Sequence, residues 1–246
     1  MSMFSGKAVG GPKYKETTLP FKHASIANVV LNACYELSTV ERRIIFIILS
    51  HMDSSKELDS NKDYAMNVED YAKLCSISIK DAYETLKDNC DKLFDRRIVI
   101  HGLESKKSKK QIRWIQSITF IPETHEIKVK WASDIIPFIS QLTSNFTRLL
   151  NKDYIPIESK YASRLYDLLY QEKWKGHKGK KEIYLDDLIA LWCIPESCQE
   201  FKFLKSRILV PAIKELEERQ LAKIELIVGK KENRKTKSVI LKYWVK

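Results

Sequence analysis

The sequence predicts an α+β fold made of two similar halves, in each of which helices are followed by a strand hairpin with a basic tip. The order helix, strand, basic loop, strand occurs twice at an offset of about 127 residues (229 minus 102), so that Gly102 matches Gly229 and Leu86 matches Ile213. The 246 residues are 44% hydrophobic, which is enough for two folded cores. We therefore expect a flexible tail over residues 1–22 and two domains, over residues 23–150 and 151–246.

The bulk composition indicates the kind of partner. A net charge of +11 and a pI of about 9.3 favour a polyanion. The longest apolar run, Ile44 to Leu49, is far shorter than the roughly 20 residues of a membrane span. We therefore expect a cytoplasmic protein with no membrane partner. The five cysteines are scattered, without the spacing of a metal site, and are interpreted as reduced thiols that fill apolar positions.

Helical signals open the first half. Ser38 and Glu41 form a capping box before a helix over Val40–Ser50, and its apolar run Ile44 to Leu49 predicts that this helix is buried. A shorter helix fits Val68–Cys75. Ser78 and Asp81 then cap a second helix, whose apolar residues fall on one stripe. This pair has the helix–turn–helix pattern. The stripe consists of Ala82, Leu86, Cys90 and Leu93.

Strand signals follow in the same half. We expect strands over Arg97–His101, 112–120 and Glu126–Trp131, with the lysine-rich segment 103–111 between the first two. Alternation in the third strand places Ile127, Val129 and Trp131 inward.

The second half repeats this plan. Ser159 opens a helix, a Gly/Lys-rich break covers 175–181, and a short helix covers Leu185–Leu191. A long helix over Phe201–Arg219 precedes strands over 223–228 and 239–245, which flank a basic loop over 229–238. Leu204, Ile208, Ala212 and Leu216 form its core face. A helix–turn–helix followed by a two-stranded ribbon is the winged-helix plan, so the fold class is two tandem winged-helix domains.

The arrangement of basic residues predicts a DNA-binding surface in the second half. Residues 151–246 carry 21 Lys and Arg against 14 Asp and Glu, whereas the first 150 residues carry 22 against 18. The first turns of a recognition helix reach base edges in the major groove. Helical projection puts Ser206, Arg207 and Lys214 opposite the core face and Lys205 nearer the core, and Pro211 should bend the helix. The recognition-helix candidates are Lys202, Lys205, Ser206, Arg207 and Lys214.

Two basic loops complete the predicted surface. The second-half loop can reach phosphates or a minor groove, and its candidates are Lys230, Lys231, Arg234, Lys235 and Lys237. The first half should add phosphate contacts, while Asp81, Glu84 and Asp88 weaken its own helix as an anion-binding face. Its candidates are Lys80, Lys106, Lys107, Lys109 and Lys110. An ordinary charged helix face and a solvated turn remain as alternatives.

The sequence lacks recognisable enzyme motifs. No two of the five histidines are close, which argues against a nicking initiator, and there is no phosphate-binding loop, His-Glu-x-x-His or Gly-x-Ser-x-Gly motif. Asp186 and Asp187 fit the start of a short helix, where carboxylates favour the helix dipole. We therefore expect no catalytic residues, no metal and no cofactor.

Several segments together resemble the replication initiator (Rep) proteins of iteron-containing plasmids. They are Leu31-Asn-Ala, Leu37 to Arg43, Ser159-Lys-Tyr-Ala-Ser-Arg-Leu-Tyr166, Leu185–Leu191 and Phe201 to Glu215. The resemblance covers about residues 25 to 246. Many relatives have a denser arginine cluster in the recognition helix, and Phe203 and Ser206 depart from it. Arg164 belongs to the resembling motif and is expected either to touch a phosphate or to brace the domain.

The resemblance implies an activity and a set of partners. A plasmid replication initiator would bind double-stranded DNA at direct origin repeats and at an operator, with homodimers in equilibrium with monomers. The dimers would repress the initiator's own promoter, and a host replication initiator and replicative helicase would be recruited. Three alternatives stay open: a winged-helix transcriptional regulator without origin activity, a nicking initiator, and a non-specific nucleic-acid or membrane-surface binder.

Overall fold

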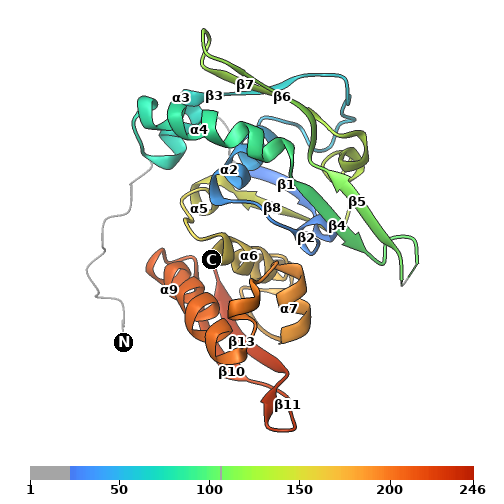
Figure 1. The fold of residues 1–246 in the computed structure, drawn as a ribbon, viewed down its shortest axis with the longest axis vertical. Coiled ribbons are helices and arrows are strands. Elements are labelled where there is room, and N and C mark those ends of the chain that lie inside the picture. The colour runs from blue at the N-terminus through green and yellow to red at the C-terminus, as the bar shows by residue number, and fades with distance from the viewer. Residues whose placement is uncertain (1–22, 106) are drawn as a thin grey trace.

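The computed structural model describes residues 23–105 and 107–246, so the expected tail over 1–22 lies outside the described residues. The chain forms two α+β halves stacked along the long axis of the molecule, the first above and the second below in Figure 1. Strands β1 (His23–Ala27) and β8 (Phe146–Leu150) pair antiparallel and thereby bring the two ends of the first half together.

The helices of the first half confirm the predicted pattern. They are α1 (Asn28–Leu31), α2 (Thr39–Ser50), α3 (Val68–Cys75) and α4 (Ile79–Phe94). The Ser38–Glu41 capping box is present, and every residue from Ile44 to Leu49 is at most 3% exposed. Ser78 caps α4, and the expected stripe Ala82, Leu86, Cys90 and Leu93 is buried.

Two three-stranded antiparallel sheets complete the first half. One has the order β2 (Cys34–Tyr35), β4 (Arg97–His101), β5 (Lys109–Arg113), and the other has the order β3 (Tyr64–Asn67), β7 (Glu126–Trp131), β6 (Ile115–Ile121). The 3-10 helix η1 (Ser133–Phe138) follows β7. Ile127, Val129 and Trp131 are buried, as predicted.

The prediction of one strand over 112–120 is wrong, because the segment splits at Trp114. β5 pairs with β4, whereas β6 pairs with β7 in the other sheet. Trp114 is fully buried and packs edge-on against Tyr35, with ring centroids 5.5 Å apart. Burying this ring at the corner between the sheets turns the backbone from one sheet into the other.

The second half begins with α5 (Asn151–Tyr154) and α6 (Lys160–Tyr170), which Ser159 caps as predicted. After the 3-10 helix η2 (Lys173–Lys175), the sheet has the order β10 (Ala222–Val228), β13 (Ser238–Val245), β9 (Lys178–Tyr184). The expected break over 175–181 is therefore wrong from Lys178 onward, because pairing with β13 draws this basic segment into the sheet as β9.

The predicted long helix forms in three consecutive parts. These are α8 (Phe201–Phe203), the π-helical turn η4 (Leu204–Leu209) and α9 (Val210–Glu218). α7 (Leu185–Leu191) has the expected bounds, and the 3-10 helix η3 (Glu196–Cys198) follows it. The widened turn directly precedes Pro211, which has no N–H to donate and whose ring crowds the preceding turn. The structure thus shows a π turn that ends two residues before Pro211, and the bend expected at Pro211 stays a prediction.

Candidate DNA interface

The outer face of the helix α8–η4–α9 carries the predicted reading residues. Leu204, Ile208, Ala212 and Leu216 are buried on its inner face, as expected. The side chains of the opposite face are exposed, and Lys205 is among them, although projection on an ideal helix puts it nearer the core. The π turn holds more residues than an α turn and so changes the projection. The exposed set is Lys202, Lys205, Ser206, Arg207 and Lys214.

An aromatic ring organises two of these cations. The Arg207 guanidinium carbon lies 4.6 Å from the centre of the Phe203 ring, and the Lys202 Nζ lies 5.8 Å from it. Within the described part of the chain, neither cation has a carboxylate partner, whereas Lys214 lies 3.6 Å from Glu218. Arg207 is therefore held in place by stacking while its hydrogen-bond donors stay available.

The second basic loop forms a wing, as predicted. Strands β11 (Lys231–Glu232) and β12 (Lys235–Thr236) pair antiparallel, and the two residues between them, Asn233 and Arg234, have φ angles of 48° and 64°. Two left-handed residues are what a tight type I′ hairpin turn requires. This hairpin is the part of the second half that projects furthest in Figure 1.

The basic residues of the wing differ in their surroundings. Lys231, Arg234 and Lys235 are exposed, and Lys237 lies 3.8 Å from Glu232. Lys230 contacts the Tyr184 ring and donates a hydrogen bond to the Tyr184 hydroxyl. This hydrogen bond, together with the nearby Glu182 carboxylate, raises the pKa of Lys230.

The base of the wing is held by a buried hydroxyl. The Ser238 Oγ accepts a hydrogen bond of 2.7 Å from the Lys230 backbone N–H and donates one of 2.6 Å to Glu182. Gly229 fits against this hydroxyl so closely that an added Cβ would lie 2.3 Å from the Ser238 Oγ. The wing therefore leaves the β10–β13 ladder at a fixed point.

The first-half candidates are more dispersed. Lys80 is exposed at the start of α4, and Lys107 and Lys109 are exposed in and beside the loop after β4. Lys110 forms a 3.0 Å ion pair with Asp134, which reduces the charge that it can offer to a phosphate. Lys106 lies outside the described residues. The expectation that this half plays a lesser part in DNA contact stays a prediction.

Arg164 is buried, so the structure corrects its place among the DNA-binding candidates. It is 6% exposed, its guanidinium lies 4.1 Å from the centre of the Tyr35 ring, and its Nη2 donates hydrogen bonds of 2.8 Å to Ala33 O and 2.9 Å to Leu191 O. Of its two expected roles, the bracing role is therefore the one that the structure shows.

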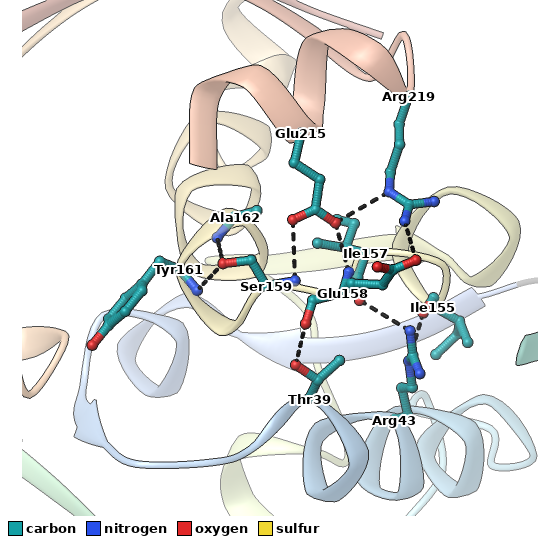
Figure 2. Close-up of polar contacts among 10 residues, drawn as sticks. All are labelled: Thr39, Arg43, Ile155, Ile157, Glu158, Ser159, Tyr161, Ala162, Glu215 and Arg219. Carbon is teal, nitrogen blue, oxygen red and sulfur yellow. Dashed lines mark hydrogen bonds and ion pairs between the residues drawn. The ribbon is translucent and has the colours of Figure 1, made fainter. Parts of the chain in front are cut away.

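The segment that joins α5 to α6 is held from both sides, as Figure 2 shows. From α2, Thr39 Oγ1 donates to Glu158 O (2.5 Å), and Arg43 donates to Ile155 O (2.8 Å) and Ile157 O (3.2 Å). α2 of the first half therefore anchors this connector through its backbone carbonyls.

From the other side, α9 holds the same connector. Glu215 accepts hydrogen bonds from the backbone N–H groups of Glu158 (2.6 Å) and Ser159 (3.1 Å). Arg219 bridges the Glu215 and Glu158 carboxylates at 3.1 and 2.8 Å (Figure 2). Because Glu215 and Arg207 belong to one continuous helix, the connector links the candidate reading face to the first half.

Sequence reasoning missed Tyr184 and the connector. Tyr184 lies at the end of β9, a segment whose Lys/Gly composition hides its strand character, although an exposed aromatic residue just before α7 is a usable signal. Thr39, Arg43 and Glu215 meet the connector only in three dimensions, and no spacing in the sequence indicates it.

These features define a DNA-binding class of fold: two winged-helix units in tandem, the second with an exposed basic helix face beside a basic wing. A model described as "Initiator Replication protein, WH1" matches residues 25–170, and one described as "Initiator Rep protein, WH2" matches residues 184–243. The chain therefore belongs to the initiator replication protein family. The first match includes α6, which packs against α9 of the second half, so the division at residue 150 stays a prediction.

Individual relatives agree with this family. The chain is 25% identical over 209 residues to a "Replication initiation protein" of Escherichia coli, covering 83% of this chain and 64% of that protein. It is 24% identical over 230 residues to the "PI protein" of Escherichia coli, covering 81% and 75%. Among solved structures, the Pi initiator protein in complex with iteron DNA matches with a TM-score of 0.75 at 22% identity, over 92% of this chain and 97% of that chain.

Proposed function

We propose that the protein is a sequence-specific DNA-binding initiator of plasmid replication that binds iterons, the direct repeats of the origin. One observation carries this proposal: exposed Arg207, stacked on Phe203 and flanked by exposed Lys202 and Lys205, lies on a helix adjoining a basic wing. Family membership supports it, as does the similar Pi initiator, which was solved with iteron DNA.

The geometry gives each group a role in this binding. An arginine guanidinium pairs with guanine O6 and N7 through two parallel hydrogen bonds. Lys202 and Lys205 suit the flanking phosphates, and the wing cations Lys231 and Lys235 reach the backbone or the minor groove. The protein would act through binding alone, without a cofactor, a metal or strand cleavage. A nicking assay on supercoiled origin plasmid with Mg²⁺ should show no cleavage.

The decisive experiment is binding of labelled direct repeats by wild type and Arg207→Ala. The variant should lose about 1–3 kcal/mol of discrimination between the iteron and a guanine-substituted repeat. Lys56→Ala, which removes one exposed cation from the first half, is the matched control and should keep the discrimination. If Arg207→Ala keeps full site preference, the assignment of the reading helix is wrong.

Self-association and repression form a further part of the proposal. Homodimers in equilibrium with monomers would bind an operator and repress the initiator's own promoter, whereas monomers at the iterons would recruit a host initiator and the replicative helicase. Light scattering after size exclusion, over a concentration series, measures the equilibrium. A single mass at all concentrations would contradict it.

A winged-helix regulator without origin activity is the alternative, since the same fold serves repressors. The two are distinguished by whether the gene and its adjacent repeats maintain a plasmid that has no other origin. Maintenance supports the initiator, and repression without maintenance supports the regulator.

No helix in residues 23–105 and 107–246 is long and apolar enough to cross a membrane. A cytoplasmic location is part of the proposal.

A further inference from the structure

Two thiols from different halves of the molecule face each other. Cys34 lies in β2 of the first half, and Cys193 lies two residues after the end of α7 in the second. Their Sγ atoms are 3.1 Å apart, and both cysteines are free and partly exposed. The DNA-binding proposal makes no use of this pair.

The backbone around each thiol is held in place. Cys34 pairs with Val99 in the β2–β4 ladder. Cys193 follows α7 in a left-handed conformation, with φ 49°, and the next residue, Ile194, donates a 3.0 Å hydrogen bond back to Ile189 O. Neither sulfur is therefore carried by a long free loop.

One guanidinium nitrogen ties the two segments together. Arg164 Nη2 donates both to Ala33 O, one residue before Cys34, and to Leu191 O, two residues before Cys193. Arg164 is buried, and its hydrogen bonds hold the backbone segments before Cys34 and Cys193 side by side, so the tertiary structure itself keeps the two sulfurs facing each other.

We propose that Cys34 and Cys193 are a modification site at which the two winged-helix domains are joined by a reversible disulfide, with a low-molecular-weight disulfide as the oxidant. A disulfide bond is about 2.05 Å long, so each sulfur needs to move by roughly half an ångström from its present position.

The reaction balances as thiol–disulfide exchange. One protein thiol loses its proton and attacks the small disulfide, which releases one small thiol and leaves a mixed disulfide on the protein. The second protein thiol then loses its proton and attacks the protein sulfur of that mixed disulfide, which releases the second small thiol. The protein loses two electrons and two protons, and the oxidant gains them as two thiols.

The surroundings set the speed of this reaction. Burial, together with the hydrogen bond to Cys34, raises the pKa of Cys193 to about 12. Since the thiolate is the nucleophile, exchange at neutral pH is slow and becomes faster as the pH rises. The disulfide should therefore form faster at high pH than at neutral pH.

The bond would fix how the two DNA-binding units are placed relative to each other. It closes a loop that runs through most of the first half and into the second, so it restricts the unfolded chain and prevents separation of the halves. Native cross-links of this kind should raise the Tm by about 5–10 °C.

The test equilibrates the purified full chain with glutathione buffers of increasing disulfide content and counts thiols after denaturation. Wild type should fall from five thiols to three, and its digest should contain a Cys34–Cys193 linked peptide. Cys34→Ser and Cys193→Ser should form no linked peptide and show no rise in Tm. Cys198→Ser, which removes a neighbouring thiol, should behave as wild type.

Three outcomes would overturn the proposal. One is a wild-type chain that keeps five thiols after equilibration in the most oxidising buffer at pH 8.5. The second is glutathione that stays attached to Cys34 or Cys193 as a mixed disulfide. The third is a linked peptide that involves another cysteine or a second chain. Because none of these readouts uses DNA, they test the disulfide independently of the proposed function.

Discussion

Arg42 of α2 and Asp167 of α6 form an ion pair that is almost completely withdrawn from water, with side chains 3% and 1% exposed. The Arg42 guanidinium carbon lies 5.1 to 5.8 Å from the ring centres of Tyr35, Phe46 and Tyr154. The Arg42 Nη1 also donates a 3.0 Å hydrogen bond to the Tyr35 hydroxyl. Helices α2 and α6, which both lie in the segment that the first family model matches, are thus joined by a buried charge pair as well as by apolar contact.

Removing one partner of this pair should destabilise the protein strongly. Asp167→Ala leaves the Arg42 guanidinium buried without its counter-charge, and the expected loss is about 3–5 kcal/mol of unfolding free energy. Glu36→Ala, which breaks the partly exposed Lys160–Glu36 pair, should cost under about 1 kcal/mol. Urea unfolding measures both variants. The ion pair is not important for stability if the two variants lose the same amount.

His51 should make stability depend on pH. Burial lowers its pKa, although the Ala65 carbonyl and Asp70 act in the opposite direction. Protonation therefore favours the unfolded chain, and the stability that neutral His51 contributes is present above its unfolded pKa of about 6.5 and is lost as the pH falls. Unfolding of wild type and His51→Gln at pH 7.5 and 5.5 should show a difference that shrinks at the lower pH. A difference that is constant or grows would contradict this.

Local signals explain which parts of the fold the sequence predicts. The capping residues and 3.6-residue periodicity of α2 and α4 lie within each segment, so α2 is predicted to within one residue and the capped start and buried stripe of α4 are predicted correctly. β9 is a strand because β13 pairs with it, and the split at Trp114 depends on a ring packed against Tyr35. No short-range pattern in the sequence predicts either contact.

The candidate site likewise has some features that the local sequence predicts and others that depend on the tertiary structure. Exposure of Ser206 and Arg207 follows from helical projection, since the opposite stripe is apolar. The position of Lys205 depends on a π turn that no propensity indicates. The resembling motif leaves both a phosphate contact and a bracing role open for Arg164, because only the tertiary structure reveals the two carbonyls to which it donates.

Phe203 should sharpen base reading by holding Arg207 in place. Phe203→Leu removes the ring under the guanidinium, and a lost cation–π contact at an exposed site should lower discrimination between iteron and substituted repeat by about two- to fivefold. Phe203→Tyr keeps the ring and should keep the discrimination. Competition binding measures both variants, and equal discrimination by Phe203→Leu and wild type would show that stacking does not matter.

The wing should contribute affinity without base preference. In Lys231→Ala/Lys235→Ala, two exposed cations are lost, so the slope of log K against log salt should become shallower by about 2 if each cation neutralises one phosphate. Binding should weaken by the same factor on iteron and on unrelated duplex. Lys56→Ala/Lys62→Ala removes the same charge from the first half and should leave the slope unchanged. A loss confined to the iteron would instead assign base reading to the wing.

The connector should make the two halves act on DNA as one unit. Glu215→Ala removes the carboxylate that holds the Glu158 and Ser159 N–H groups, at a cost of about 1.5–3 kcal/mol for charged hydrogen bonds. The test uses a repeat in which two base pairs are inserted between the part that the first half contacts and the part that the second half contacts. Because a turn of DNA has about 10–10.5 base pairs, the insertion rotates one part by about 70° relative to the other. Wild type should lose affinity for this DNA, and Glu215→Ala should lose less.

A matched variant separates coupling from general damage in this experiment. Glu218→Ala removes a carboxylate from the same helix without touching the connector, since Glu218 pairs with exposed Lys214. It should show the full wild-type penalty for the inserted base pairs. If Glu215→Ala shows that penalty too, while its affinity for the uninterrupted repeat falls, Glu215 stabilises the second half and does not couple it to the first. If only Glu215→Ala loses less affinity for the DNA with inserted base pairs, the connector normally transmits strain from the rotated site to the reading helix.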